Sequence, residues 1–435
     1  MAAEETPEGS SWQEIDSPPF KQAVSDLRFV NISIKCYEKK TGSGFKEEYY
    51  AYKILAILSK TDGDETEPSS SSRTRYETWR RYSEFEMLRN FMQFVYPHVV
   101  MPPLPEKAIR GSANLLNKIT FSGEDVEFLL QRQHALEIFL VRISRHPVLS
   151  KNVWFHEFLK TVSWKEKLLQ SGYNGKGSET LFQSLSLQLS KHGPDSRFQD
   201  AKAYATDLDT ILRTILEIRQ KLNSSMTSLY KVHSNYGRIF NEMSLVEDKL
   251  GTPLQVASGC LDNYADSSDS YFNEEESRFY LPIKEYIGFS ESLKSLTRRH
   301  EVLQKQLEKA EELVSSRAES RNTLLKNNPE EGGTGGKKFS FKSLSARLRG
   351  EDISYEGQKA TAERELTDAE EALTDIQKEF DEFTRDALQE LENFNDQKFG
   401  DFRSMLINYV QLQLHIHKKG MTTWQRIKDG FETEN

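Results

Sequence analysis

The chain has 435 residues, of which 58 are basic and 67 acidic, and its formal charge at pH 7 is −9. Only 37% of the residues are apolar and 29% are charged. This composition excludes a protein that crosses a membrane many times, and the acidic balance argues against a general nucleic-acid binder. The length predicts two or three domains, and the low apolar content favours one compact domain joined to long, exposed helices.

Cysteine usage and the N-terminal sequence both bear on the compartment. The two cysteines, Cys36 and Cys260, are too few for a disulfide framework or a cysteine metal site, and they indicate a reducing compartment. The opening residues MAAEETPEGSSWQE lack the apolar core of a signal peptide. No run of about 18 apolar residues occurs, so no membrane-spanning segment is expected. These features together predict a cytoplasmic protein.

The first part of the chain predicts strands followed by helices. Residues 1–27 are polar and acidic, and we expect a disordered tail there. The segments 27–38, 48–58 and 73–82 are rich in β-branched and aromatic residues and predict three strands. A helix is expected over 83–96, where Ser83 and Glu86 have the spacing of a capping box.

A Pro-rich turn over 97–107 follows this helix, and two further helices are predicted over 124–145 and 148–160. The first domain is therefore an α+β domain with a three-stranded antiparallel sheet, expected over 28–161. Residues 162–195 are expected to be a linker. Within it, 178–191 form a candidate amphipathic helix, for which packing on a neighbouring element and insertion into a membrane remain equal alternatives.

From residue 196 the sequence predicts an all-α domain that extends to 431, with three long helices at about 196–250, 254–326 and 356–430. Pro282 lies inside the second helix and is expected to bend it. Two heptad seams support the helices, and their length favours a dimer. The first seam is Leu208, Ile211, Ile215, Ile218, Leu222, Ser225, Leu229, Val232, Tyr236, Ile239, Met243 and Val246; the second is Ala362, Leu366, Ala369, Leu373, Ile376, Phe380, Phe383, Ala387, Leu391 and Phe394.

A basic segment lies between the second and third of these helices, in a tip loop expected over 327–355. Its cations alternate with aromatic and apolar residues, which favours contact with an anionic membrane over a solvated loop. The candidate membrane-contact residues are Lys337, Lys338, Lys342, Arg347 and Arg349.

The heptapeptide WRRYSEF (79–85) carries the strongest chemical signal in the sequence. Two arginines end a predicted strand directly before a helix begins. A guanidinium matches a phosphate with two hydrogen bonds, and a helix N-terminus adds positive potential. The alternative is a solvated strand edge followed by a plain helix cap.

The order RRYSEF, PPLPEK and RQHALEIFL resembles the PX domain of the sorting nexins. The resemblance implies that Arg81 binds the 3-phosphate of phosphatidylinositol 3-phosphate and that Tyr82 stacks against the inositol ring. It also implies that Ser83 contacts the same phosphate. In addition, it implies that Lys107 binds the 1-phosphate and Arg132 the free 4- and 5-hydroxyls.

The loop after the Pro-rich turn is the segment that the PX family inserts into bilayers. The candidate membrane-insertion residues here are Ile109, Leu115 and Leu116. The alternative is that these side chains pack back onto their own domain.

The helical part, with YKVHSNYGRIF and KKGMTTW, resembles the BAR domain of one sorting-nexin subgroup, an all-α fold of three long, curved helices. The resemblance implies a peripheral coat protein on the cytosolic face of early and recycling endosomes. It implies roles in endocytic recycling, protein transport and autophagy. It also implies partnership with a second copy or with another PX-BAR sorting nexin. No cofactor is implied.

An enzyme is the rival class, and the sequence offers no catalytic motif in its support. His415 and His417 have no matching second cluster and fit a helix surface, and GGTGG (332–336) lies between helices rather than after a strand. No metal site is expected. A second alternative is an endosome-addressed coiled-coil scaffold that does not deform membranes.

Overall fold

The computed structural model describes residues 27–41, 48–60, 73–107, 126–173, 193, 195–326 and 355–432. The described residues pack as two compact units. The first unit combines residues up to 178 with Lys202–Lys294 and Leu391–Asn435, and the second combines Glu179–Ala201 with Ser295–Glu390.

The three predicted strands form one antiparallel sheet in the order β1-β2-β3, as expected. Strand β1 is Leu27–Thr41, β2 is Glu48–Lys60 and β3 is Arg73–Arg81. The register of β1 shifts between Phe29 and Asn31 and again between Ile34 and Cys36. Irregularities of this kind increase the twist of a sheet and help it to wrap around a core.

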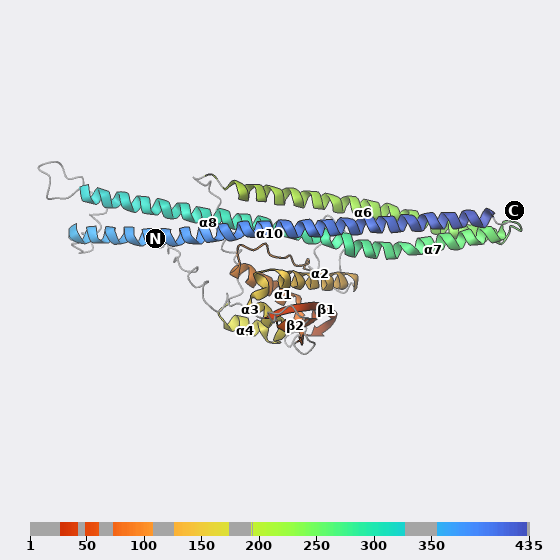
Figure 1. Ribbon diagram of the computed structural model, residues 1–435, viewed down its shortest axis with the longest axis horizontal. Helices are drawn as coiled ribbons and strands as arrows, with labels where there is room; N and C mark the ends of the chain where they lie inside the picture. Colours follow the sequence, from red (N-terminus) through yellow and green to blue (C-terminus); the bar gives the residue numbers. More distant parts are fainter. Residues whose placement is uncertain are drawn as a thin grey trace, which may run out of the picture. The chain divides into compact units, whose positions relative to one another are not determined.

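Helices cover one face of this sheet and complete the first domain (Figure 1). They are α1 (Tyr82–Val95), α2 (Val126–Arg145), α3 (Val153–Lys160) and α4 (Trp164–Gln170). The core contains aromatic residues from the sheet and from all four of these helices, including Tyr52, Phe85 and Phe158. Trp164, Leu168 and Tyr173 also lie in this core, so its packing extends beyond the boundary expected at residue 161.

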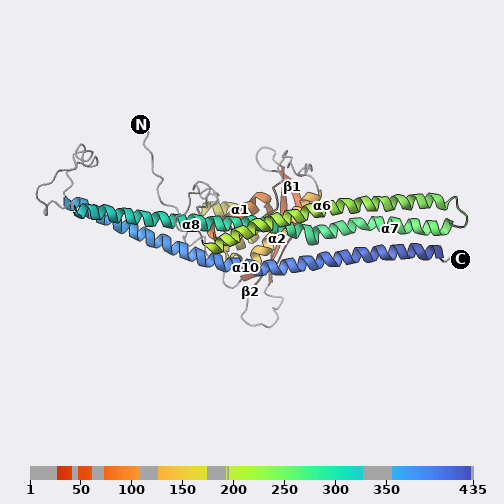
Figure 2. The same ribbon diagram turned by 90° about the horizontal axis from the view of Figure 1, so that it is seen from above.

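The long helices of the C-terminal part are α6 (Ser196–Ser244), α7 (Gly251–Glu275), α8 (Leu281–Lys326) and α10 (Tyr355–Glu432). Within the first unit, α6, α7 and the C-terminal half of α10 run side by side (Figures 1 and 2). The first long helix ends at Ser244, not near residue 250. Gly251 and Pro253 begin α7 rather than ending the helix before it, because a proline in a first turn loses no helical hydrogen bond.

A single π-helical turn interrupts the second long helix. It spans Glu276–Tyr280, between α7 and α8, and Pro282 follows it in the first turn of α8. A proline inside a helix removes one backbone donor, and a π turn absorbs such a break without ending the helix. The structure shows a change of helix type just before Pro282, and the expected bend there stays a prediction.

The two heptad seams have different environments. The members of the α10 seam are buried or half-buried within their own units, and Ala387 is completely buried. The α6 seam is mostly exposed: Ile218 keeps 60% of its surface and Leu229 51%. A row of large apolar residues along one helix face that its own chain does not cover is typical of an interaction surface.

Several predictions fall on residues outside the described ranges. These are the disordered tail of residues 1–26 and the candidate amphipathic helix at 178–191. The membrane-insertion candidates Ile109, Leu115 and Leu116 and the tip residues Lys337, Lys338, Lys342, Arg347 and Arg349 also lie outside the described part of the chain.

Arg80 is the most unusual member of the first core, because its side chain is only 1% exposed. Its guanidinium donates hydrogen bonds to the carbonyl of Phe158 at 2.8 Å and of Val162 at 2.9 Å, and also to that of Thr161. These carbonyls belong to the C-terminal end of α3, where helical acceptors lack partners and positive charge is favourable. Arg80 therefore fastens the end of β3 to the end of α3.

We expect Arg80→Ala to lower the free energy of unfolding of the first domain by about 3 kcal/mol, because several buried carbonyls lose their donor. Urea unfolding followed by tryptophan fluorescence measures this change. Arg75→Ala is the matched control, since Arg75 lies on the same strand but its side chain is 65% exposed. An unchanged midpoint for Arg80→Ala would contradict this role.

Candidate functional site

Strand alternation separates the two arginines of the WRRYSEF motif. Successive side chains of a strand point to opposite faces, so when Arg80 enters the core, Arg81 must face away from it. Arg81 is exposed, and its guanidinium carbon lies 4.8 Å from the ring centre of Tyr49 on the neighbouring strand. Arg81 is therefore the arginine of the pair that is accessible to a ligand.

Tyr82 begins α1 and joins the strand end to the Pro-rich turn. Its hydroxyl donates a 2.6 Å hydrogen bond to the carbonyl of Pro105. Burial raises the pKa of Tyr82 to about 12, against the opposing effect of the Arg132 charge, so the hydroxyl remains a donor at neutral pH. The ring is thereby held in one orientation.

Arg132 lies over the ring of Tyr82. Its guanidinium carbon is 4.8 Å from that ring centre and 4.3 Å from the ring centre of Phe128. One terminal nitrogen donates to the carbonyl of Glu106 at 2.9 Å. Its Nε is buried and has no hydrogen-bond partner among the described residues. A guanidinium fixed beside two aromatic rings is suited to an oxygen-bearing ligand.

Lys107 ends the Pro-rich segment 101–107, and its side chain contacts Glu86 of α1. Its Nζ lies 3.0 Å from a carboxylate oxygen of Glu86, and the lysine side chain is 62% exposed. An ion pair this exposed is weak, so an anionic ligand can replace the carboxylate at little cost.

The start of α1 differs from the sequence-based expectation. The helix begins at Tyr82, and the side chain of Glu84, not Glu86, accepts from the backbone N–H of the residue before the helix, Arg81, at 2.9 Å. Ser83 therefore lies in the first turn and is half-buried. The expected capping box was wrong in register because the strand runs to Arg81 and the chain turns there.

The structure brings Tyr82, Arg132 and the Glu106–Lys107 end of the Pro-rich segment together. Arg81 and Ser83 flank Tyr82 in the chain, one on the exposed face of β3 and one in the first turn of α1. Of the predicted binding residues, Arg132 is the one whose side chain contacts the Tyr82 ring, although the two lie 50 residues apart in the sequence.

Sequence reasoning missed three side chains that support these residues. Tyr49 lies beneath Arg81, Glu86 holds Lys107, and Phe128 contacts Arg132. Phe128 and Arg132 are four residues apart on α2, a spacing that places them on one helix face and was available from the sequence. The contacts of Tyr49 and Glu86 depend on sheet register and on the Pro-rich turn.

This arrangement is suited to binding rather than to bond cleavage. Its functional groups are permanent cations and a tyrosine whose hydroxyl is occupied by a backbone carbonyl. One cation over the Tyr82 ring, with further cations on the adjoining strand end and Pro-rich segment, matches a ligand that combines a ring with phosphate groups.

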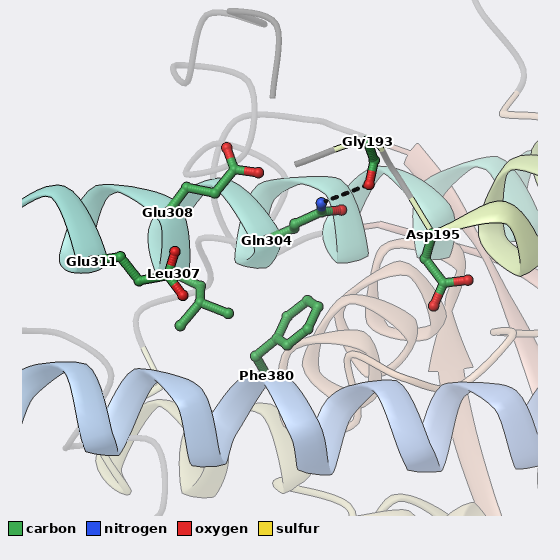
Figure 3. A pocket seen from close by; sticks show the side chains of 7 residues that line it. All are labelled: Gly193, Asp195, Gln304, Leu307, Glu308, Glu311 and Phe380. Atoms are coloured by element: carbon green, nitrogen blue, oxygen red, sulfur yellow. Dashed lines mark hydrogen bonds between the residues drawn. The ribbon is translucent and has the colours of Figure 1, made fainter. Parts of the chain in front are cut away.

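The second unit contains a cavity of about 430 Å³ with a different character (Figure 3). It is lined by Leu307 and Phe380 together with the carboxylates of Asp195, Glu308 and Glu311. At its edge, Gln304 donates to the carbonyl of Gly193 at 3.4 Å. The acidic lining disfavours a phosphate ligand, so the anion site is expected at Tyr82 and not here.

The described residues also bear on metal binding and on membrane crossing. No group of His, Cys, Asp and Glu side chains there is arranged to hold a metal ion. Among those same residues, no helix has the length and apolar character needed to cross a membrane.

Comparisons with known proteins agree with both parts of the chain. Residues 68–161 match the family model described as PX domain, and residues 340–429 match the model described as Vps5 C terminal like. Sorting nexin-4 of Homo sapiens is 33% identical over 93% of this chain and 87% of that protein. Sorting nexin-30 of Homo sapiens is 24% identical over 88% of this chain and 74% of that protein.

A solved structure supports the fold. The cryo-EM structure of the SNX-BAR Mvp1 tetramer matches 93% of this chain and 100% of that chain with a TM-score of 0.57 and 15% identity. The sequence matches and the structural match therefore both indicate a PX domain followed by a domain of long helices. The chain belongs to the sorting nexin family, in the subgroup that combines a PX domain with a BAR domain.

Proposed function

We propose that this sorting nexin is a non-enzymatic membrane adaptor that binds phosphatidylinositol 3-phosphate on early endosomes. In this proposal Arg81 and Ser83 bind the 3-phosphate, Tyr82 stacks on the inositol ring, Lys107 binds the 1-phosphate and Arg132 the free hydroxyls. The protein then supports endocytic recycling, protein transport and autophagy-linked sorting from the cytosolic face of early and recycling endosomes.

The observation that carries the proposal is the arrangement of cations around Tyr82. Arg132 is oriented by the Glu106 carbonyl and by two aromatic rings, and it keeps a buried nitrogen without a partner in the described structure. Arg81 is exposed on the adjacent strand end. A headgroup with a single extra phosphate needs one strong phosphate clamp and donors for its hydroxyls, which is the division of roles proposed here.

Arg81→Ala is expected to weaken binding to liposomes containing phosphatidylinositol 3-phosphate by at least about tenfold, because charge-assisted hydrogen bonds are lost. Liposome sedimentation measures the loss. Arg75→Ala removes the same charge from the same strand and is expected to bind like the wild type. Equal binding by Arg81→Ala, with unchanged helix content by circular dichroism, would refute the assigned site.

We further propose that two chains pair through the exposed seam of α6, either as a homodimer or with another PX-BAR sorting nexin. The seam presents a row of large apolar residues, including Ile211 at 58%, Val232 at 47% and Tyr236 at 52% exposure. Exposed residues of α10, such as Val410 at 54% and Leu414 at 55%, add to the apolar surface available for pairing. Burial of large apolar side chains contributes about 1.5–3 kcal/mol each, so even part of this surface is enough to favour a dimer.

The double variant Leu229→Glu with Val232→Glu is expected to convert the purified dimer into a monomer, because two charges would be buried without partners. Light scattering measures the mass directly. Ser224→Glu is the control, since Ser224 is exposed on the same helix but lies outside the seam. A variant that remained dimeric would place the interface elsewhere.

The proposed dimer concentrates two headgroup sites on one membrane and so favours membranes rich in the lipid. The alternative function is a coiled-coil scaffold that reaches endosomes through its PX domain without deforming them. The exposed seam agrees with both, since both need a partner.

Electron microscopy of liposomes with the purified protein separates the two functions. We expect the wild-type protein to draw phosphatidylinositol 3-phosphate liposomes into tubules, and the Leu229→Glu, Val232→Glu variant to bind them weakly without tubules. Tight binding of the wild-type protein to liposomes that stay spherical would favour the scaffold.

A further inference from the structure

The Pro-rich segment 101–107 has few hydrogen bonds of its own to hold it in place. Pro102, Pro103 and Pro105 have no backbone N–H, so the segment cannot join a sheet or helix through these residues. Its position depends on donors that come to its carbonyl groups from other elements. Those donors come from two directions.

On the pocket side, the donors are the predicted headgroup residues. Tyr82 donates to the carbonyl of Pro105 at 2.6 Å, and Arg132 donates to the carbonyl of Glu106 at 2.9 Å. Moving the segment therefore moves the ring and the guanidinium that surround the proposed ligand.

At the start of the segment, the donors come from α8 and α1. Ser292 donates its hydroxyl to the carbonyl of Met101 at 2.7 Å, and both residues are buried. Arg89 of α1 donates to the carbonyl of Pro102 at 3.2 Å and lies 3.5 Å from the Ser292 hydroxyl. Donors from α1 and α2 thus hold the end of the segment, and donors from α1 and α8 hold its start.

Gly288, one turn before Ser292, allows this close approach. A Cβ atom added at Gly288 would lie 2.4 Å from Cβ and 2.9 Å from Cγ of Pro103. Non-bonded carbon atoms do not approach each other this closely, and the ring of a proline cannot rotate out of the way. Any side chain at position 288 must therefore push the Pro-rich segment away from α8.

Helix α2, which carries Arg132, is also attached to α8. Arg142, at the C-terminal end of α2, donates two hydrogen bonds of 2.8 Å to Glu285 and one of 2.5 Å to Asp401. Tyr286 donates to the same oxygen of Asp401 at 2.7 Å. Burial acts to lower the pKa of Arg142, but hydrogen bonds and charge interactions with Glu285 and Asp401 outweigh it and raise the pKa.

The Pro-rich segment and α2 therefore both contact residues 285–292 of α8. We propose that Gly288 and Ser292 are positioning residues of the headgroup pocket, through which α8 sets the affinity of the PX domain for its phosphoinositide. The inference rests on the proposed function of that pocket. It makes the long helix a component of lipid recognition, in addition to any role in pairing.

The first test measures binding of a water-soluble, short-chain phosphatidylinositol 3-phosphate to the full-length chain by calorimetry. A soluble ligand removes the contributions of avidity and of membrane insertion. Gly288→Val is expected to bind about tenfold or more weakly, because the displaced segment misaligns charge-assisted contacts. Gly259→Val is the matched control: Gly259 lies in α7, and a Cβ added there would meet no atom within 4 Å.

The second test uses Ser292→Thr and Ser292→Val, two side chains of the same shape that differ by the hydroxyl. Ser292→Thr keeps the donor to the Met101 carbonyl and is expected to bind within about twofold of the wild type, whereas Ser292→Val is expected to lose about threefold to tenfold. Equal loss in both variants would assign the effect to the added methyl group and would count against the hydroxyl.

The outcomes separate this inference from the proposed function. Wild-type affinity in Gly288→Val and in Ser292→Val, with Arg81→Ala inactive, would overturn the positioning role and leave the pocket intact. Wild-type affinity in Arg81→Ala would overturn the proposed pocket itself. Loss in Gly288→Val and Ser292→Val, with binding kept in Ser292→Thr and Gly259→Val, would establish the positioning role.

Discussion

Burial of the Arg80 guanidinium against the end of α3 orients the residues of the proposed binding site. A buried arginine is stable only when its donors are satisfied, and here the C-terminal carbonyls of a helix satisfy them. Because side chains alternate along a strand, the same contact turns Arg81 outward and starts α1 at Tyr82. One structural arginine therefore determines where the exposed cation and the ring are placed.

The Pro-rich segment then connects this strand end to the long helices. Its prolines leave it with acceptors and few donors, so its carbonyls collect hydrogen bonds from α1, α2 and α8. Prolines restrict the backbone of such a segment, so a shift of one neighbouring helix also shifts the residues at the other end of the segment. Residues of the PX domain and of the long helices, within the same compact unit, therefore both contact the segment that borders the proposed ligand site.

The two apolar seams show how the long helices divide their surfaces. The seam of α10 is covered by the chain's own helices, whereas most of the α6 seam is left exposed. A helix that presents charge and apolar residues on separate faces is stable only when the apolar face is covered. The intrachain contacts of α6 use a second face that contains Leu212 and Tyr230, which leaves the seam available to a partner.

The order and type of nearly every element could be predicted from local sequence, because strand composition, heptad spacing and breaking residues act locally. It also indicated the five predicted headgroup residues through a resemblance that spans three separated motifs, and these remain predictions. Local patterns misplaced the cap of α1 and the end of α6, since helix ends depend on where neighbouring elements stop. The burial of Arg80, the exposure of most of the α6 seam and the close approach of Gly288 to Pro103 became visible in the three-dimensional packing alone. Each of these is a contact, or a missing contact, between segments far apart in the chain, and no local periodicity encodes such a distance.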